Sequence, residues 1–295
     1  MTRDRWVVLG LASVRAPWFR QVTGWAMSGV LPIDFVKCVS TEEVLARLRS
    51  SRTHSAILVD GSLHGVDRDL LQAATRQNVS TFVVTAPTLD RDWAELGSTA
   101  TLPPDFTRAD LLEELQQHAV AVAAQHTTLA PTPTADERDT QGRLISVIGR
   151  AGSGVSTTAI AVAQGLADDP RNGGRVVLVD FARRADLAVL HDAHDIVPGL
   201  QELTEAHRVS TPSAEQVRAM TFNVAHRGYD LLLGLRRPRD WTSLRPAAFE
   251  AAVEGLRRAY HFVIADLDDD LEGAEDGGIR DVEDRILAAR HATVS

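Results

Sequence analysis

A glycine-rich stretch near the middle of the chain carries the residue types best suited to chemistry. Residues 149–156 read Gly-Arg-Ala-Gly-Ser-Gly-Val-Ser, the G-x4-G-x-[ST] frame of a phosphate-binding loop between a strand and a helix. Glycines let successive backbone N–H groups turn toward one phosphate, and a helix N-terminus adds positive partial charge. Ser156 stands where a hydroxyl would coordinate Mg²⁺. The candidate nucleotide-binding residues of this stretch are Gly149, Arg150, Gly152, Ser153, Gly154, Val155, Ser156 and Thr157.

Val155 departs from the frame, because a phosphate loop normally has lysine at this position. That lysine reaches the β- and γ-phosphates and offsets the charge that develops during transfer. Valine can do neither. We therefore expect weak binding of ATP or ADP with Mg²⁺, and a plain glycine-rich turn without a ligand stays open as the alternative.

A second chemical signal is Asp266, which ends the strongly apolar run Phe262–Asp266. A carboxylate at the end of such a strand is typical of a Walker B site, so Asp266 and Ser156 are the candidate metal ligands. The acidic run that follows, from Asp268 to Asp276, is typical of a solvated loop and matches no calcium-binding frame.

The glycine-rich stretch resembles the deviant Walker A loop of the MinD/ParA ATPases, with Arg150 at the position of the signature lysine. The run Val176–Asp180 is similar to the family strand that ends in the switch I acid, which implies a nucleotide-binding role for Asp180. The segment Pro198–Leu203 resembles the Gly-Leu helix start of the CpaE branch. The family carries a second switch I acid that positions water, and this chain has Ala182 there.

The resemblance therefore implies weak or absent ATPase activity, since both Val155 and Ala182 replace residues that the reaction uses. Arg183 and Arg184 follow at once and could restore positive charge near a phosphate. Two solvated arginines are the alternative interpretation.

The N-terminal segment has a third candidate, Asp60, at the end of the run Ala56–Asp60. A CheY-type receiver carries its phosphorylated aspartate at such a position, and Thr85-Ala86 resembles its Thr/Ser-Ala pair. Receiver chemistry also needs an acidic pair after the first strand and a lysine after the fifth. This chain has Gly10-Leu11 and Leu102-Pro-Pro104 instead. Asp60 is thus a pseudo-phosphoacceptor, and the domain is expected to serve as a docking or dimerisation surface.

Short β-branched runs alternate with amphipathic stretches along the chain, which predicts an α/β fold. Residues 1–124 are predicted to form a flavodoxin/CheY-like pseudo-receiver domain, residues 125–142 a linker rich in Thr and Pro, and residues 143–295 a MinD/ParA-like P-loop domain with a degenerate Walker A loop and a doubly wound parallel sheet. The chain ends soon after Phe262–Asp266, so the second domain is either shortened at its C-terminus or small. Glu283–His291 is a candidate for one more helix.

The expected strands are Trp6–Ala12, Ile33–Val39, Ser55–Asp60, Thr81–Thr85, Thr99–Leu102, Leu144–Ile148, Arg175–Asp180, Asp230–Leu235 and His261–Asp266. The expected helices include Thr41–Arg49, Arg108–Ala124, Thr157–Ala167 and Phe249–Ala259.

The pairing of a receiver-like domain with a lysine-free Gly154-Val-Ser-Thr157 loop resembles the actinobacterial CpaE-like group of septum site-determining proteins. That resemblance implies a regulatory or positioning protein with partners at the septum or in a Flp-pilus/Tad-type secretion assembly, a homodimer, and peripheral association with the inner face of the cell membrane. Two alternatives stay open: a working ATPase that uses Arg150 or Arg183 in place of lysine, and a response regulator switched by phosphorylation of Asp60.

Composition narrows these expectations. The formal net charge is −9, which argues against a dedicated nucleic-acid-binding surface. Cys38 is the single cysteine, so no intrachain disulfide can form. No run approaches the roughly 18 apolar residues of a membrane span, and the apolar stretch from Trp6 to Ala12 fits a strand better than a signal peptide. A cytoplasmic location is expected.

Overall fold

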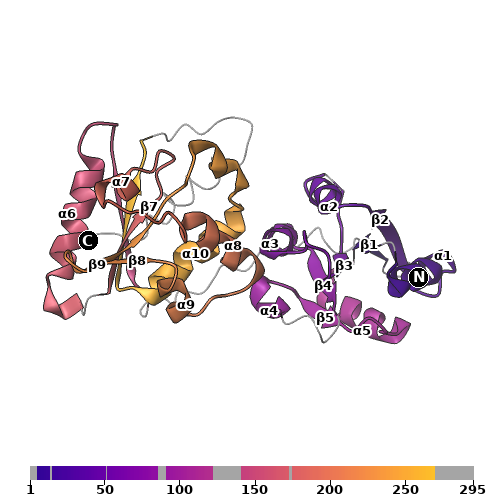
Figure 1. The fold of residues 1–295 in the computed structure, drawn as a ribbon. Helices are drawn as coiled ribbons and strands as arrows, with labels where there is room; N and C mark the ends of the chain where they lie inside the picture. The colour runs from indigo at the N-terminus through magenta and orange to yellow at the C-terminus, as the bar shows by residue number, and fades with distance from the viewer. Residues whose placement is uncertain are drawn as a thin grey trace. The chain divides into compact units, whose positions relative to one another are not determined.

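The computed structural model describes residues 5–13, 15–50, 52–85, 91–121, 141–172 and 175–269. The chain divides into two compact units, Met1–Pro133 and Thr134–Ser295, and the break falls inside the stretch predicted to be a linker. Each unit is built around its own sheet (Figure 1). No helix in the described ranges is long and apolar enough to cross a membrane.

The first unit has a five-stranded sheet in which every neighbouring pair is parallel. The strands are β1 (Trp6–Leu11), β2 (Ile33–Cys38), β3 (Ala56–Asp60), β4 (Ser80–Val84) and β5 (Ala100–Leu102). Their order across the sheet is β2-β1-β3-β4-β5, the order of the flavodoxin and CheY folds. The α/β fold predicted for this segment is confirmed.

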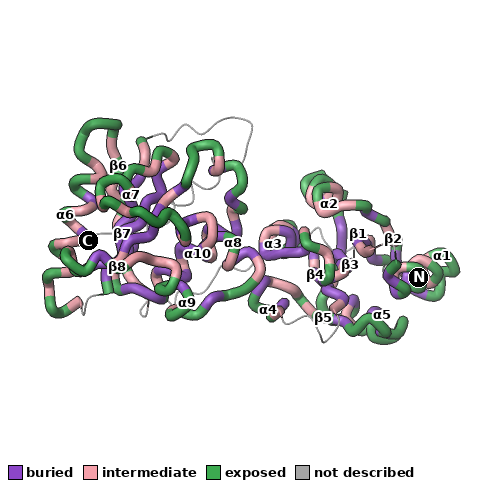
Figure 2. The backbone as a smooth tube through the Cα atoms, in the orientation of Figure 1, coloured by how far each residue is buried: buried purple, intermediate pink, exposed green. Residues whose placement is uncertain are grey.

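Alternate residues of these strands point to opposite faces of the sheet, and both faces are covered. The helices are α1 (Pro17–Met27), α2 (Thr41–Leu48), α3 (Arg68–Arg76), α4 (Trp93–Leu96) and α5 (Arg108–His118). One buried cluster joins Val8 and Phe82 to Trp18 of α1 and Leu111 of α5. The other joins the opposite strand face to α2, α3 and α4. Figure 2 shows the central strands as the buried part of this unit.

Two predicted helices show how local signals set helix ends. The Ser40 and Glu43 spacing predicts a capping box at the start of the helix expected over Thr41–Arg49, and the Ser40 side chain does accept a hydrogen bond from the Glu43 N–H at 3.3 Å. The reciprocal bond is different, because the Glu43 carboxylate accepts from the Val39 N–H at 2.8 Å and not from the Ser40 N–H. The helix predicted over Arg108–Ala124 is too long, because α5 ends at His118 and Ala119 is already extended.

The second unit has a mixed five-stranded sheet. Its strands are β6 (Arg143–Ile148), β7 (Val176–Asp180), β8 (Phe222–Val224), β9 (Tyr229–Leu232) and β10 (Phe262–Leu267). The order is β6-β10-β7-β9-β8, and the β8–β9 pair is antiparallel. The prediction of a purely parallel sheet is wrong at this edge, because β8 and β9 are joined by a short turn that only an antiparallel pair can use.

Helices cover both faces of this second sheet (Figure 1). They are α6 (Val155–Ala167), α7 (Leu187–Leu190), α8 (Leu200–Val209), α9 (Ala214–Arg218) and α10 (Pro246–Ala259), with the short 3-10 helices η3 (Pro170–Asn172) and η4 (Pro238–Ser243). On one face Ala159 and Ala163 of α6 pack against Leu178 and Ile264. On the other, Leu203 of α8 and several α10 side chains share a core with the opposite strand face. Because β6, β10 and β7 are parallel neighbours, their carboxyl ends lie side by side at the same end of the sheet.

Candidate functional site

The glycine-rich loop joins β6 to α6, as its sequence frame requires. Gly152 and Gly154 have φ angles of 81° and 86°, a left-handed conformation that glycine adopts without strain. Gly154 is the N-cap of α6, and no side chain caps the first turn of this 13-residue helix. The first-turn N–H groups therefore have no side-chain acceptor among the described residues, and free N–H groups at a helix N-terminus are the groups that bind anions.

Val155 is the first residue of α6 and lies half-buried over the start of the loop. A Cβ placed on Gly149 would come within 3.0 Å of Val155 Cγ2, so this side chain packs on the loop backbone. Arg150, Ser153 and Thr157 are exposed around it. The loop thus has open N–H groups, and no lysine stands at the position from which a P-loop lysine reaches phosphate.

Ser156 lies next to the end of β10. Its hydroxyl is hydrogen-bonded to the carboxyl group of Asp266, which is 4% exposed. Burial raises the pKa of Asp266, the charges of Asp268 and Asp186 raise it further, and the Ser156 hydrogen bond opposes them. The two predicted metal ligands are therefore neighbours in the structure.

Asp180 and Asp266 are directly opposite each other in the parallel register of β7 and β10. Asp180 is fully buried, its Oδ2 accepts a hydrogen bond from the Leu187 N–H at 2.9 Å, and its Oδ1 has no hydrogen-bond partner of ordinary geometry. Burial raises the pKa of Asp180 to about 7, with the Leu187 N–H opposing and the Asp266 charge adding to the rise. A carboxyl group with such a pKa is poised between its neutral and ionised forms near neutral pH.

The loop after β7 is held by hydrogen bonds to Asp268, the first residue of the acidic run that was predicted to be a solvated loop. Asp268 is half-buried, and its Oδ2 accepts hydrogen bonds from the backbone N–H groups of Arg183 at 2.6 Å and Arg184 at 3.4 Å. The solvated-loop interpretation is wrong for this residue, because a tertiary contact 85 residues away in sequence satisfies the carboxylate. Ala182 in the same loop is buried and offers no group that could orient water. The acidic residues from Asp270 onward and Glu283–His291 lie outside the described residues.

Gly234, just after β9, packs directly over Asp180. A Cβ there would lie 2.7 Å from the Asp180 carbonyl oxygen and 2.7 Å from Ala185 Cβ. Asp186, which adds its charge to both buried aspartates, follows in the same loop. The sequence reasoning missed both residues, and only the non-local packing of the β7 and β9 ends reveals them.

These residues can hold a phosphate and part of a metal shell. Mg²⁺ usually takes one or two protein ligands and completes its shell with waters and substrate phosphates, which Ser156 and Asp266 beside an open helix N-terminus could support. Among the side chains that the structure describes, no group of three or more His, Cys, Asp or Glu is arranged to hold a metal ion alone.

The receiver-like position Asp60 ends β3, and its carboxylate already has partners. Oδ1 accepts hydrogen bonds from the Ser62 N–H at 3.0 Å and the Ser62 hydroxyl at 2.7 Å, and Oδ2 accepts one from the Ser13 N–H at 3.4 Å. The residues beside Asp60 are therefore Ala12 and Ser13, and the earlier assignment of the acidic-pair position to Gly10-Leu11 is wrong by two residues. β1 continues through Leu11, which is paired with Val59.

The two residues that follow β1, Ala12 and Ser13, also include no acid. Thr85 follows β4 and Pro103 follows β5, as predicted, so no lysine follows the fifth strand. Ala86 lies outside the described residues. Among the described residues, the strand ends around Asp60 therefore carry neither the acidic pair nor the lysine that a receiver uses.

Comparison with known proteins gives structural neighbours for part of the chain. No family model matches, and no curated protein matches. The receiver domain of a sensor histidine kinase from Pseudomonas aeruginosa PAO1, described with a magnesium ion in its active-site cleft, matches at 20% identity and a TM-score of 0.32, covering 38% of this chain and 96% of its own. The receiver domain of a Francisella response regulator matches at 19% identity and a TM-score of 0.31, covering 38% and 94%. The fold of the first unit follows independently from its own strand order.

Proposed function

We propose that this chain is a regulatory protein whose second unit binds a magnesium nucleotide weakly and turns it over slowly or not at all. The observation that carries this proposal is the uncapped N-terminus of α6, reached through the left-handed residues Gly152 and Gly154 and placed beside the Ser156–Asp266 pair. This arrangement supplies backbone donors for phosphate and oxygen ligands for Mg²⁺.

Weak binding follows from the half-buried valine at the start of α6. Val155 replaces a charge-assisted contact to phosphate, a kind of hydrogen bond worth about 1.5–3 kcal/mol. Losing it weakens affinity by about 10- to 150-fold, because each 1.4 kcal/mol is a factor of ten. The glycines, the helix N-terminus and Ser156 remain.

Slow turnover follows from two missing functions. Val155 cannot offset the charge that develops on the transferred phosphoryl group, and buried Ala182 cannot orient an attacking water. Arg150 is exposed at the edge of the loop, and Arg183 is tied to Asp268 through its backbone N–H. Nucleotide would thus act as a ligand that shifts the protein's state.

The first unit then serves as a docking or dimerisation surface in this proposal. The Asp60 carboxylate accepts hydrogen bonds from Ser62 and Ser13, and no acid is described at the neighbouring end of β1. Both observations support a role for this unit other than phosphoryl transfer. The motif resemblance favours partners of septum formation or of a pilus or secretion assembly at the inner face of the membrane, with the net charge of −9 favouring protein partners over nucleic acid.

Calorimetry with Mg-ADP on the full chain tests the nucleotide site. We expect weak binding for the wild type and tighter binding for Val155→Lys, which restores the missing charge. Ala161→Lys is the matched control, because Ala161 is exposed on the same helix outside its first turn and should leave affinity unchanged. If Val155→Lys binds no better and neither protein gives heat with millimolar nucleotide, the loop is a structural turn and the proposal fails.

A further inference from the structure

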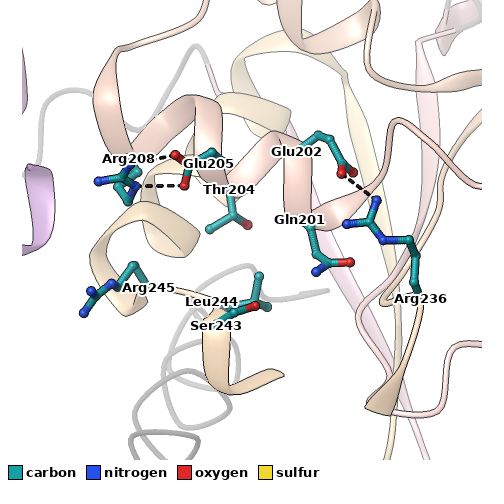
Figure 3. A pocket seen from close by; sticks show the side chains of 9 residues that line it. All are labelled: Gln201, Glu202, Thr204, Glu205, Arg208, Arg236, Ser243, Leu244 and Arg245. Atoms are coloured by element: carbon teal, nitrogen blue, oxygen red, sulfur yellow. Dashed lines mark hydrogen bonds and ion pairs between the residues drawn. The ribbon is translucent and has the colours of Figure 1, made fainter. Parts of the chain in front are cut away.

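The helix α7 is a single turn that follows the loop after β7. It packs on the α6 face of the second sheet, the face opposite α8 and the pocket drawn in Figure 3. The Leu187 side chain is fully buried in that core, whereas Val189 and Leu190 are 81% and 48% exposed. A single turn with so little buried surface has little stability of its own, so α7 depends on the bonds at its two ends.

Hydrogen bonds hold α7 at both ends. At its start the Leu187 N–H donates to Oδ2 of Asp180 at 2.9 Å, which ties the helix to the candidate site. At its end His191 uses both ring nitrogens. Nδ1 lies 2.8 Å from the Leu187 carbonyl oxygen, and Nε2 lies 2.6 Å from the hydroxyl of Tyr229 on β9. The two rings also meet edge to face, with centroids 5.8 Å apart, so His191 joins α7 to the sheet.

The backbone directly after His191 is held in a conformation that needs support. Asp192 has a φ angle of 51°, in the left-handed region that a residue with a Cβ rarely adopts. It ends α7 in a Schellman turn, in which the Asp192 N–H donates to the Val189 carbonyl at 3.2 Å and the Ala193 N–H to the Ala188 carbonyl at 2.9 Å. Such a conformation persists where the surrounding structure holds it, and the adjacent bond between His191 and β9 supplies a hold.

The partners of His191 fix where its hydrogen lies. Because the Leu187 carbonyl can only accept, Nδ1 carries the hydrogen, and Nε2 of the neutral ring accepts from the Tyr229 hydroxyl. The same hydroxyl is also hydrogen-bonded to the Arg227 side chain. A proton on Nε2 would therefore face the hydroxyl hydrogen of Tyr229 and would place a second cation beside Arg227.

The surroundings of His191 also oppose a positive charge. Burial lowers the pKa of His191 below its ordinary value of 6.5, the hydrogen bond to the Leu187 carbonyl opposes this, and the charges of Arg227 and His226 lower the pKa further. The helix α6, which packs in the same core, has no charged or titratable side chain, and Asp192 is exposed to solvent. A charge on His191 is therefore disfavoured while α7 is docked and favoured once the ring reaches water.

We propose that His191 is a pH-sensitive latch, which holds α7 against β9 when the ring is neutral and releases α7 when the ring is protonated. Release withdraws the Leu187 N–H from Asp180 and uncovers the Leu187 side chain. Acid thus loosens the segment that borders the candidate site. The latch works without nucleotide, so it is independent of the nucleotide binding proposed above.

The sign and size of the effect follow from proton linkage. The released ring has a pKa near 6.5 and the docked ring a lower one, so docking is fully favoured above pH 6.5 and is lost progressively as the pH falls below it. Between pH 7.5 and pH 5.5 the released ring goes from about one tenth to about nine tenths protonated. The opening constant of α7 should therefore rise by up to about tenfold over this range.

Hydrogen exchange of the full chain without nucleotide, read by mass spectrometry on peptides that contain α7, measures this opening once intrinsic exchange rates are corrected for. We expect the rise in wild type and its loss in His191→Phe, in which α7 should open more at both pH values. Tyr229→Phe keeps the buried ring and removes only the hydroxyl, so it should raise the opening at pH 7.5 and reduce the pH dependence. His194→Gln is the matched control, because His194 is an exposed histidine of the same segment, and it should behave as wild type.

Asp180 also changes charge near neutral pH, so the same measurement is made in Asp180→Asn, where the rise should persist. The proposal is overturned if wild type shows no rise, if His191→Phe keeps it, or if Asp180→Asn abolishes it, since acid would then act through Asp180. Long-range ¹H–¹⁵N spectra should place the His191 hydrogen on Nδ1 at pH 7.5, and a hydrogen on Nε2 alone would contradict the latch. Peptides from α10 in the same samples verify that each variant is folded.

Discussion

Replacing Asp180 with asparagine should stabilise the second unit at neutral pH, and the gain should depend on pH. Burial raises the pKa of Asp180 from 3.8 to about 7. The folded protein therefore keeps a proton on this group at pH values where the unfolded chain has lost it. Stability contributed by the neutral carboxyl is fully present below about pH 4 and is lost as the pH rises toward 7.

The size of the effect follows from the same shift. About three pH units at 1.36 kcal/mol each give about 4 kcal/mol as the full change in unfolding free energy between acid and neutral pH. Asparagine keeps an oxygen for the Leu187 N–H and carries no charge at any pH, so it avoids the cost of ionising this buried group. The advantage of Asp180→Asn over wild type should therefore grow by up to about 4 kcal/mol between pH 4 and pH 7.

Hydrogen exchange read by mass spectrometry on peptides from β7 and β10 measures this in the full chain, because protection of core strands reports the opening free energy of their own unit. Asp195→Asn is the matched control, since Asp195 is exposed in the same unit. A difference between Asp180→Asn and wild type that stays constant from pH 4 to pH 8 would refute the reasoning. It would mean that Asp180 is ionised in the folded protein across this range.

Three further outcomes are expected. Steady-state phosphate release from ATP should stay far below about 1 s⁻¹, the lower end of ordinary enzyme turnover. The reason is that Val155 supplies no charge to the phosphates and Ala182 cannot position water. Turnover near about 1 s⁻¹ that is abolished by Ser156→Ala would contradict this. Intact mass after acetyl phosphate treatment should show no adduct on Asp60, and an adduct on wild type that is absent from Asp60→Ala would show a working receiver site. Gly234→Ala should destabilise the second unit by about 1–3 kcal/mol, because its Cβ would lie 2.7 Å from the Asp180 carbonyl; an unchanged denaturation midpoint would show that the loop yields without cost.

Much of the fold was readable from local sequence signals. Continuous apolar runs marked β7 and β10, because strands buried on both faces need apolar residues at every position. The Ser40 and Glu43 spacing marked the start of α2, since its capping bonds join residues three or four apart. The glycine-rich frame marked the turn into α6, where two left-handed residues are required.

Other features depended on pairings between distant segments. β10 is the last of the described strands yet lies between β6 and β7, and only this placement sets Asp180 beside Asp266. The residues next to Asp60 lie two positions later in the sequence than predicted. The reason is that β1 extends through Leu11, which is paired with Val59 of β3. The partner of Asp268 lies 85 residues away, so a composition-based reading had no access to it.

The burial of two polar atoms on α8 is the clearest case of what tertiary structure alone decided. Thr204 and Gln201 have ordinary helix spacing, and nothing in their sequence context indicates that both oxygens are buried without partners. That property depends on the packing of α8 against α10 in the second unit. By itself the sequence determined which segments are strands and helices and which chemical groups they carry, because those follow from local spacing. Which groups meet, and which are buried unpaired, depended on non-local strand order and helix packing.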